Sequence, residues 1–356
     1  MEPDAEHTSA KVRQQMLQLL TGYWASKTLS VTAELGVADF MALCGPCHAE
    51  ALASHLGSPT DTVARLLRAL QAMGVVEPIK PDEAPVSVAS PVPGPRYGLT
   101  SLGRLLDSAD PSSLNATARV VGDEFFSAWT ALSHSIRTGE PAFQVKFGGP
   151  LFAHLADGPA ERALLFDRAM EEINGPEIAA ILSSYRFEHC RHVMDIGGGN
   201  GGMLDALLSR HPMLHGTLFD RPQVVAGARD RLARPVSEGR CSLHPGDFFL
   251  AVPSGPDMFL LRHILHDWAD REAVTILRRV ARAMRPGARL LIVEDVMPEA
   301  HASPQQALLD LHMLAVAGGQ ERTIAQYQAL LSAGGLCLAA THQTPLGVTL
   351  LEAVLG

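Results

Sequence analysis

Val193-Met-Asp-Ile-Gly-Gly-Gly-Asn-Gly-Gly-Met203 is the stretch of sequence that decides the fold. Its first four residues are apolar apart from one acid, as in a strand buried within a sheet, and the glycines predict a tight turn into a helix over 203–209. Glycine in such a turn lets a ligand approach bare backbone and the amide groups that open the helix. The stretch therefore predicts a nucleotide-type binding loop.

The glycines fit two kinds of nucleotide ligand. Gly197, Gly199 and Gly202 satisfy the dinucleotide fingerprint G-x-G-x-x-G, and Asp220 lies about where that fingerprint places a ribose-binding acid. Asp195 favours a cationic ligand instead, because a carboxylate there repels a pyrophosphate and attracts an ammonium and a sulfonium. We therefore favour S-adenosylmethionine over NAD, and a glycine turn without a ligand is the third possibility.

Strand-like and helix-like patterns alternate after residue 192, which predicts an α/β domain with a Rossmann-like, doubly wound sheet. The expected strands are 193–196, 216–220, 241–245, 258–262 and 289–296, with hairpin-like pieces near 337–343 and 348–354. Ligands of such sheets bind at the carboxyl ends of the strands. There we expect Asp220 to bind the ribose hydroxyls and Asp247, with Phe248, to bind adenine. Either acid could instead serve only as a helix cap or turn residue.

The composition describes an ordered, acidic protein with room for two domains. Of its 356 residues, 47% are hydrophobic and 19% are charged, and the net charge is −9, which argues against a nucleic-acid partner. No apolar run has the length of a membrane span and the N-terminus is acidic, so we expect a cytoplasmic protein without membrane contact. The five cysteines, an odd number, fit reduced thiols.

Cys44-Gly-Pro-Cys47 matches the C-x-x-C motif of thioredoxin-like redox proteins. That motif works where a strand delivers the first cysteine to a helix N-terminus, whereas residues 34–43 predict helix and turn. A structural role for the two cysteines is therefore favoured over a redox role. We expect no zinc site either, because a second cysteine or histidine pair at ligand spacing is missing.

The N-terminal part of the chain predicts a small helical domain over 1–110. The expected elements are two helices over 11–43 that join at 21–24, two shorter helices over 48–73, and strands at 75–77 and 96–100 that flank a Pro-rich loop over 78–95. This order is typical of a winged helix, which raises a DNA-binding regulator as a rival hypothesis. Arg65 and Arg68 alone offer little to phosphates, so a dimerisation module is favoured.

Residues 112–186 predict helices that are rich in bulky apolar side chains. Most of these side chains would be core, yet aromatic residues make up only 5% of the chain, and their concentration here also suits a flat organic substrate. The candidate pocket residues are Trp129, Phe143, Phe166 and Met170. We expect the catalytic domain to span 111–356, with a helical pocket segment at 111–188 and a Rossmann-like core at 189–356.

Leu261-Arg-His-Ile-Leu-His-Asp-Trp-Ala-Asp270 carries the candidate chemistry. His266 falls a turn beyond a strand's carboxyl end, where a neutral imidazole near pH 7 could remove a phenolic proton without a metal. A histidine beside an aspartate is as often structural, and we assign His263 no chemistry. Glu294 and Glu321 favour a catalytic His266, since two carboxylates would orient the ring and favour its protonated form.

Five motifs follow one another along the chain: Val193-Met-Asp-Ile-Gly-Gly-Gly-Asn-Gly, Gly246-Asp-Phe-Phe249, Arg262-His-Ile-Leu-His-Asp-Trp-Ala-Asp270, Leu291-Ile-Val-Glu-Asp-Val-Met-Pro298 and Gly318-Gly-Gln-Glu-Arg-Thr323. In this order they resemble the motifs of the S-adenosylmethionine-dependent O-methyltransferases, which include plant caffeate and isoflavone enzymes, acetylserotonin methyltransferase and bacterial natural-product tailoring enzymes. The resemblance covers nearly the whole chain, including the N-terminal helices.

The resemblance implies a base at His266 with acids at Glu294 and Glu321. It implies cofactor contacts at Gly197, Asp220, Asp247, Phe248 and Arg262, and an acceptor contact at Met313. It also implies a homodimer of intertwined winged-helix-like domains, in which the helices near Tyr23 and Trp24 reach toward the acceptor pocket of the partner subunit. His312 departs from the plant pattern, so no plant substrate is carried over.

The segments 122–130 and 138–143 look closer to bacterial members that act on phenazines, polyketides and carotenoid-type acceptors. We therefore expect methylation of a hydroxyl on a small aromatic or polyketide-like secondary metabolite. The acceptor could be a phenol, an enol or a ring nitrogen. Rival hypotheses are N- or C-methylation, hydroxylation or decarboxylation on the same fold, and a winged-helix regulator.

Overall fold

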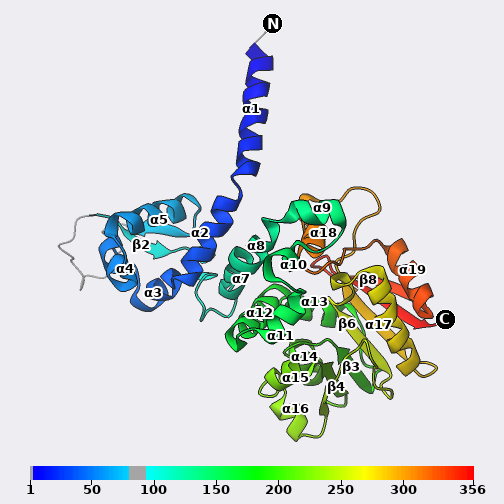
Figure 1. Cartoon of the computed structure of the whole chain (residues 1–356). Helices are drawn as coiled ribbons and strands as arrows, with labels where there is room; N and C mark the ends of the chain where they lie inside the picture. The colour runs from blue at the N-terminus through cyan, green and yellow to red at the C-terminus, as the bar shows by residue number, and fades with distance from the viewer. Residues whose placement is uncertain (1–2, 80–93) are drawn as a thin grey trace. The chain divides into compact units, whose positions relative to one another are not determined.

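A computed structural model of the chain describes residues 3–79 and 94–356, which form two compact units (Figure 1). Unit 1 comprises Met1–Phe126 and Arg168–Ile173, and unit 2 comprises Ser127–Asp167 and Asn174–Gly356. The domain boundary at 110 stays a prediction, and most of the predicted loop over 78–95 lies outside the described residues. Within those residues, no helix is both long and apolar enough to cross a membrane.

Unit 1 is mostly helical and carries a two-stranded antiparallel sheet. Its elements are α1 (Pro3–Leu20), α2 (Tyr23–Glu34), α3 (Val37–Cys44), α4 (Ala49–Leu56), α5 (Thr60–Ala72), β1 (Val76–Ile79), β2 (Arg96–Leu99), α6 (Ser101–Arg104), α7 (Asn115–Val120) and the π-helix η2 (Val121–Phe125). The order α4, α5, β1, β2 confirms the predicted helix, turn, helix and hairpin. Buried side chains from α3, α4, α5 and both strands form its core.

The prediction of two helices over 11–43 was wrong, because three helices form there. α2 ends at Glu34 and α3 begins at Val37. Gly36, between them, has a φ of 67°. This left-handed backbone conformation interrupts a helix, and residues other than glycine rarely adopt it. The turn at Gly36 lets Val37 and Met41 of α3 enter the core.

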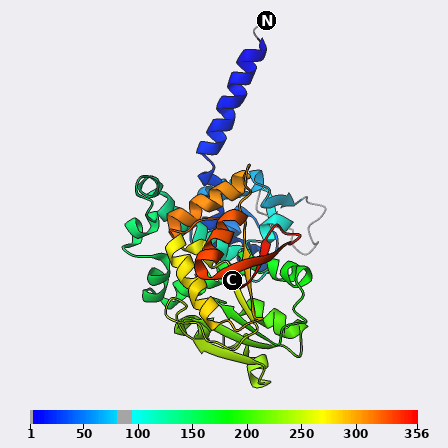
Figure 2. The same cartoon turned by 90° about the vertical axis from the view of Figure 1, so that its right-hand side faces the viewer.

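The long helix α1 extends away from the rest of unit 1 (Figures 1 and 2). Its described side chains, from residue 10 onward, are exposed, including Met16 (56%), Leu19 (71%) and Leu20 (64%). Residues three and four apart lie on one face of a helix, so these three apolar side chains form a stripe open to solvent. Such a stripe normally marks an interaction surface.

Unit 2 contains a seven-stranded sheet in the order β5-β4-β3-β6-β7-β9-β8. The strands are β3 (His192–Ile196), β4 (His215–Asp220), β5 (Cys241–Pro245), β6 (Met258–Arg262), β7 (Arg289–Glu294), β8 (Leu336–Gln343) and β9 (Thr349–Leu355). The first five are parallel, and β9 runs antiparallel to β7 and β8. This confirms the predicted doubly wound α/β sheet with its terminal hairpin.

The helices of unit 2 precede the sheet along the chain or connect its strands, and several of them cover its two faces. They are α9 (Leu132–Thr138), α10 (Ala142–Phe147), α11 (Leu151–Asp157), α13 (Glu177–Ser184), α14 (Gly202–Arg210), α15 (Pro222–Gly227), α16 (Ala233–Ser237), the 3₁₀ turn η3 (Leu265–Asp267), α17 (Asp270–Ala283), α18 (Pro304–Val316) and α19 (Ile324–Gly334). Parts of α8 (Phe126–Trp129) and α12 (Ala160–Asn174) also belong to unit 2.

The two faces of the sheet are buried in two separate apolar clusters. Met194 and Ile196 pack with side chains of α17 and α19, whereas Val193 packs with side chains of α13 and α14. Neighbouring side chains of a strand point to opposite faces, which explains why Val193 and Met194 enter different clusters. β3 therefore lies in the middle of the main core with β4 on one side and β6 on the other, and its carboxyl end is the place where such sheets bind ligands.

Candidate active site

The glycine-rich turn leaves the carboxyl end of β3 and requires glycine for two different reasons. Gly197, Gly199 and Gly201 have φ values of 70°, 57° and 79°, which favour glycine. At Gly197 a Cβ would also lie 2.4 Å from Cδ1 of Ile264, so the turn packs closely against the segment that follows β6. A Cβ at Gly199 would meet no described atom within 4 Å, so at this point the turn faces open space.

Asp195 is buried beneath this turn with one carboxylate oxygen unsatisfied. The residue is 1% exposed, and its Oδ2 has no hydrogen-bond partner among the described residues. Burial raises the pKa of Asp195 to about 7, although Arg262 opposes the shift and Asp220 adds to it. A buried, unsatisfied carboxylate at the carboxyl edge of a parallel sheet can bind a cationic group of a ligand. The surroundings of Asp195 therefore fit S-adenosylmethionine, which carries an ammonium and a sulfonium.

Asp220 ends β4 and binds the glycine turn through backbone amides. Its Oδ2 accepts a hydrogen bond from the Gly199 amide at 3.0 Å, and its Oδ1 accepts one from the Arg221 amide at 2.6 Å. Each carboxylate oxygen has a further lone pair, so the turn role and the predicted ribose role are compatible. Asp167, which was not predicted, lies near this carboxylate: burial, together with Asp220, raises the pKa of Asp167 to about 6.

The remaining candidate cofactor residues lie around the same edge of the sheet. Asp247 is exposed, and its Oδ1 accepts a hydrogen bond from the Phe249 amide at 2.8 Å. Phe248 packs edge-on against Phe249 and Trp268, with ring centroids 4.9 Å and 6.1 Å away. Arg262 ends β6 and donates to the Asn174 carbonyl oxygen at 3.2 Å.

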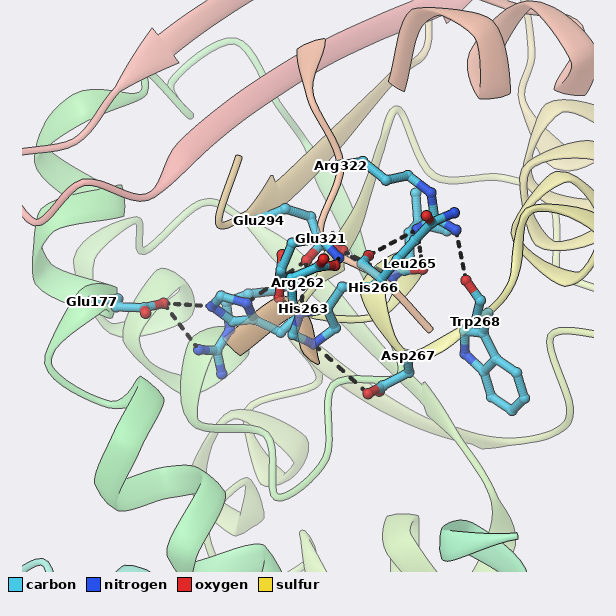
Figure 3. A network of polar contacts seen from close by, with 12 residues as sticks. Glu177, Arg262, His263, Leu265, His266, Asp267, Trp268, Glu294, Glu321 and Arg322 are labelled. Atoms are coloured by element: carbon cyan, nitrogen blue, oxygen red, sulfur yellow. Dashed lines mark hydrogen bonds and ion pairs between the residues drawn. The ribbon is translucent and has the colours of Figure 1, made fainter. Parts of the chain in front are cut away.

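His266 lies between two buried carboxylates (Figure 3). Its Nδ1 is 2.9 Å from Oε1 of Glu321 and 3.5 Å from Oε2 of Glu294. Glu294 ends β7, and its other oxygen accepts a hydrogen bond from the Leu265 amide at 2.9 Å. The structure thus brings together the three side chains that the sequence singled out, although they lie 28 and 55 residues from His266 along the chain.

The carboxylates change the protonation of His266. Burial alone lowers the pKa of this imidazole, but Glu294, Asp267 and the hydrogen bond with Glu321 outweigh burial and raise the pKa to about 10. His266 therefore carries a proton at neutral pH, which differs from the neutral imidazole expected near pH 7. The sequence pointed to two carboxylates, but the third, Asp267, adds its charge at 3.8 Å from Nε2.

His263 joins the same cluster, although the sequence assigned it no chemistry. Its Nε2 lies 2.7 Å from Oε2 of Glu177, and its Nδ1 lies 3.9 Å from Oε2 of Glu294 (Figure 3). With a φ of 52°, it is the one residue other than glycine at positive φ in the part of the chain that the structure describes. His263, His266 and Glu294 are close enough to hold a metal ion, so the expectation of a metal-free site stays a prediction.

Residues 319–322 contact the backbone of the turn that carries His266. The Arg322 guanidinium is fully buried and donates to the carbonyl oxygens of Leu265 and Trp268, both at 2.7 Å. The Gln320 amide donates to the His266 carbonyl oxygen at 2.9 Å. Next to it, Gly319 approaches so closely that a Cβ would lie 1.8 Å from that oxygen. The backbone of His266 is therefore fixed by contacts that only glycine permits.

We expect Gly319→Ala to destabilise the protein by about 2–3 kcal/mol, because the methyl group would force the two backbone segments apart. Gly227→Ala is the matched control, since a Cβ at Gly227 would meet no described atom within 4 Å. Urea unfolding of both variants measures the difference. Equal stability of Gly319→Ala and the unchanged protein would show that the segments are not packed as described.

The residues that we expected to contact the acceptor differ in their burial and in their contacts. The Trp129 indole donates to Nδ1 of His312 at 3.0 Å, and the two rings stack with centroids 6.3 Å apart. Met313 follows His312 in α18 and is partly buried. Phe143 is fully buried and packs on Phe147, with ring centroids 4.4 Å apart, so it belongs to the packed interior of its helices.

The other two candidates share helix α12. Phe166 lies in unit 2 and is half-buried, whereas Met170 falls in the part of α12 that belongs to unit 1. Their roles at the site stay predictions.

The two cysteines of the C-x-x-C motif are unlike a reactive pair. Cys44 is exposed at the end of α3, and Cys47 is buried and forms a backbone bridge with Tyr97. Burial, with a smaller effect of Cys44, raises the pKa of Cys47 to about 11. A reactive cysteine of this motif has a lowered pKa, so the environment of Cys47 favours a structural role.

Comparisons with known proteins agree over almost the whole chain. The family model of the O-methyltransferase domain matches residues 129–337, and that of the O-methyltransferase dimerisation domain matches residues 17–108. Phenazine O-methyltransferase of Lysobacter antibioticus is 37% identical over 338 residues, which are 95% of each chain.

Solved structures also match over almost the whole chain. The structure of mitomycin 7-O-methyltransferase, 33% identical, superposes with a TM-score of 0.88 and covers 99% of this chain and 100% of that one. Human N-acetylserotonin methyltransferase, solved with S-adenosylmethionine, is 25% identical, has a TM-score of 0.86, and covers 97% of this chain and 98% of that one.

Proposed function

The chain belongs to the O-methyltransferase family, and from that premise we propose that it methylates a hydroxyl of a small aromatic or polyketide-like secondary metabolite with His266 as the base. The observation that carries the proposal is the imidazole of His266 between the buried carboxylates of Glu294 and Glu321. Ile264, two residues before His266, packs against Gly197 of the turn that ends β3. The proton acceptor and the nucleotide-type turn therefore belong to one site.

The same premise supports S-adenosylmethionine as the methyl donor, because it supplies an electrophilic methyl sulfonium. We propose that it is held by Asp195, Gly197, Gly199, Asp220, Asp247, Phe248 and Arg262. The unsatisfied oxygen of Asp195 would accept from a cationic group, Asp220 from the ribose hydroxyls and Asp247 from the adenine amino group, while Phe248 would pack on the adenine ring. All seven residues lie at or just beyond the carboxyl ends of β3, β4, β5 and β6.

The raised pKa of His266 suits the proton transfer that we propose. A phenol has a pKa of about 10, so transfer to an ordinary imidazole of pKa about 6.5 is uphill. With the pKa of His266 at about 10, the transfer is nearly balanced. Glu321 and Glu294 stabilise the imidazolium that forms, and the ionised oxygen of the acceptor becomes the nucleophile. An acceptor that arrives already ionised at a protonated His266 gives the same ion pair.

This ion pair predicts a specific pH profile. For a phenolic acceptor with a pKa of about 7, we expect kcat/KM to rise up to about pH 7 as the acceptor ionises and to stay level above it. It should fall above about pH 10 as His266 loses its proton. Steady-state rates from pH 6 to about 11 test this. A narrow peak near pH 7 that falls directly above that pH, as a histidine with the ordinary pKa of about 6.5 would give, would contradict the electrostatic role of the two glutamates.

We also propose that the protein is a homodimer that uses α1. The match to a dimerisation domain includes residues 17–20 of this helix, and the exposed apolar stripe of Met16, Leu19 and Leu20 lies on one of its faces. A helix face that is exposed to solvent is normally polar, whereas this stripe is apolar. We propose that the same helix of a second copy of the chain covers it.

Replacing Met16, Leu19 and Leu20 together by glutamate should convert the dimer into a monomer, because three charges would be buried without partners. Light scattering after gel filtration measures the mass of each species. Gln14→Glu, which adds a charge on the opposite face of the same exposed helix, is the control and should leave the dimer intact. A monomeric unchanged protein at micromolar concentration would refute the proposal.

The test of the function as a whole is methyl transfer itself. Incubation with isotopically labelled S-adenosylmethionine and a panel of phenolic and heteroaromatic acceptors, followed by mass spectrometry, should give a product with one labelled methyl group on oxygen. Label on nitrogen or carbon would favour N- or C-methylation. An unlabelled product that has gained oxygen would favour hydroxylation, and one that has lost carbon dioxide would favour decarboxylation. The cytoplasmic location and the absence of a nucleic-acid partner stay predictions.

A further inference from the structure

We propose that His263 is a positioning residue for the base: held by Glu177, it orients the Glu294 carboxylate and fixes the turn that carries His266. The inference rests on the proposed function, since it concerns the base of the same reaction. Neither His263 nor Glu177 is among the residues that the resemblance to known methyltransferases assigns to the reaction.

Glu177, the first residue of α13, determines how the imidazole of His263 is turned. Its Oε2 lies 2.7 Å from Nε2 of His263, and a carboxylate can only accept a hydrogen bond, so Nε2 carries a proton and donates it (Figure 3). The side chains of His263 and Glu177 are only 8% and 15% exposed. A hydrogen bond at one ring nitrogen also fixes the direction in which the other nitrogen points.

The nitrogen on the other side of the ring faces Glu294. Nδ1 of His263 lies 3.9 Å from Oε2 of Glu294, and Nδ1 of His266 lies 3.5 Å from the same oxygen. This oxygen has no hydrogen-bond partner among the described residues, whereas Oε1 accepts from the Leu265 amide. The buried carboxylate therefore lies between two imidazole rings, and the ring of His263 limits how far Oε2 can turn away from His266.

The backbone of His263 is fixed at the same point. Its φ of 52° lies in the left-handed region, which is unfavourable for residues other than glycine. Its amide donates to the carbonyl oxygen of Val293, the residue before Glu294, at 3.0 Å. β6 ends one residue before His263, and η3 begins two residues after it. The strained residue therefore forms the turn between the strand and the base, and such strain is concentrated at functional sites.

The neighbours of His263 connect this turn to the proposed cofactor residues. Oε2 of Glu177 is 4.0 Å from Nη1 of Arg262 as well. Ile264, on the other side of His263, packs against Gly197 of the glycine-rich turn. His263 thus lies between a proposed cofactor contact and a residue that packs on the cofactor loop. Fixing His263 fixes the position of the base relative to the methyl donor, on which the rate of transfer depends.

His263→Asn separates the role of the side chain from that of the backbone. Asparagine adopts the left-handed conformation more readily than most residues, so the turn can keep its shape, but its side chain is too short to bridge Glu177 and Glu294. We expect kcat for a phenolic acceptor to fall about 10-fold or more, because the base loses its alignment. The affinity for S-adenosylhomocysteine and the KM of the acceptor should change less than about twofold. His215→Asn, at the exposed amino end of β4, is the control.

Glu177 provides a matching pair of variants. Glu177→Ala should lower kcat by a similar factor, because Nε2 of His263 loses its acceptor, whereas Glu177→Gln keeps an acceptor oxygen and should restore most of the rate. Glu188→Ala, which removes an exposed acid, is the control. The double variant of His263→Asn and Glu177→Ala should lose no more than His263→Asn alone, since both residues act through one chain of contacts. Losses that multiply would contradict this chain.

The residual rate of His266→Ala shows whether His263 acts through the base. In that background, His263→Asn should change the rate by less than about twofold, because no imidazole remains to be positioned. A further loss of about tenfold there, or a full kcat in the single variant His263→Asn, would overturn the inference and leave the proposed function intact. Absence of transfer to any phenolic acceptor by the unchanged protein would count against the proposed function instead.

Every assay contains EDTA, because His263, His266 and Glu294 are close enough to hold a metal ion. Activity that EDTA abolishes and zinc restores would assign His263 to a metal site and overturn the inference.

A second measurement needs no turnover. Nitrogen-15 NMR of the histidine-labelled full-length protein should find a proton on Nε2 of His263 that exchanges slowly with water, and the missing signal in His263→Asn assigns it. Glu177→Ala should speed this exchange about 10-fold or more, because the hydrogen bond that protects the proton is lost. An Nε2 without a proton at pH 7, or an exchange rate that Glu177→Ala leaves unchanged, would overturn the inference whatever the acceptor.

Discussion

His266→Ala is expected to lower kcat for a phenolic acceptor by about 10²- to 10⁴-fold, the range that positioned acid–base groups contribute. The imidazole is the group that Glu294 and Glu321 hold, so its removal leaves the two carboxylates without the cation that they stabilise. The affinity for S-adenosylhomocysteine should change little, because the proposed cofactor contacts lie at the ends of β3, β4, β5 and β6.

His215→Ala is the control, since His215 is exposed at the amino end of β4, on the opposite edge of the sheet. Single-turnover rates and calorimetric cofactor binding separate chemistry from binding. An unchanged rate in a His266→Ala protein that still binds cofactor would make the assignment of the base wrong.

Asp220→Ala is expected to weaken binding of S-adenosylhomocysteine by about 10- to 100-fold, the equivalent of losing hydrogen bonds to a charged acceptor. Two losses combine in this variant. The ribose hydroxyls lose their carboxylate, and the amides of Gly199 and Arg221 lose the acceptor that shapes the glycine turn.

Titration calorimetry measures the affinity, and Asp230→Ala, which removes an exposed acid that follows α15, is the control. The affinity of Asp220→Asn should lie between the affinities of Asp220→Ala and Asp230→Ala, because an amide keeps one acceptor oxygen for the glycine turn. An affinity equal to that of the unchanged protein would refute the cofactor role of Asp220.

The catalytic sheet could be predicted from the sequence because its strands are buried on both faces. Runs such as Val193–Ile196 and Met258–Arg262 are mostly apolar, and the turns between them carry glycine or proline. The predicted strands therefore fall within a few residues of those in the structure. The break at Gly36 was missed because apolar side chains continue at helical spacing on both sides of a single glycine.

The chemistry of the site was only partly predictable. His266 and Glu294 could be named from motifs at the ends of strands, and Glu321 from the glycine motif over 318–323. The raised pKa of His266, however, depends on distances to three carboxylates. The contacts of His263 with Glu177 and of Trp129 with His312 join segments 86 and 183 residues apart. No local pattern in the sequence reports such contacts, because packing of the chain creates them.

One comparison tests the central claim most directly: the unchanged protein and His266→Ala, each incubated with carbon-13 methyl-labelled S-adenosylmethionine and the phenolic acceptor that the unchanged protein methylates fastest. We predict a product with one labelled methyl group on the phenolic oxygen, formed by the unchanged protein and reduced at least about 100-fold in the variant. Equal labelling by the two proteins, or no labelled product while both proteins bind the cofactor, would contradict the account.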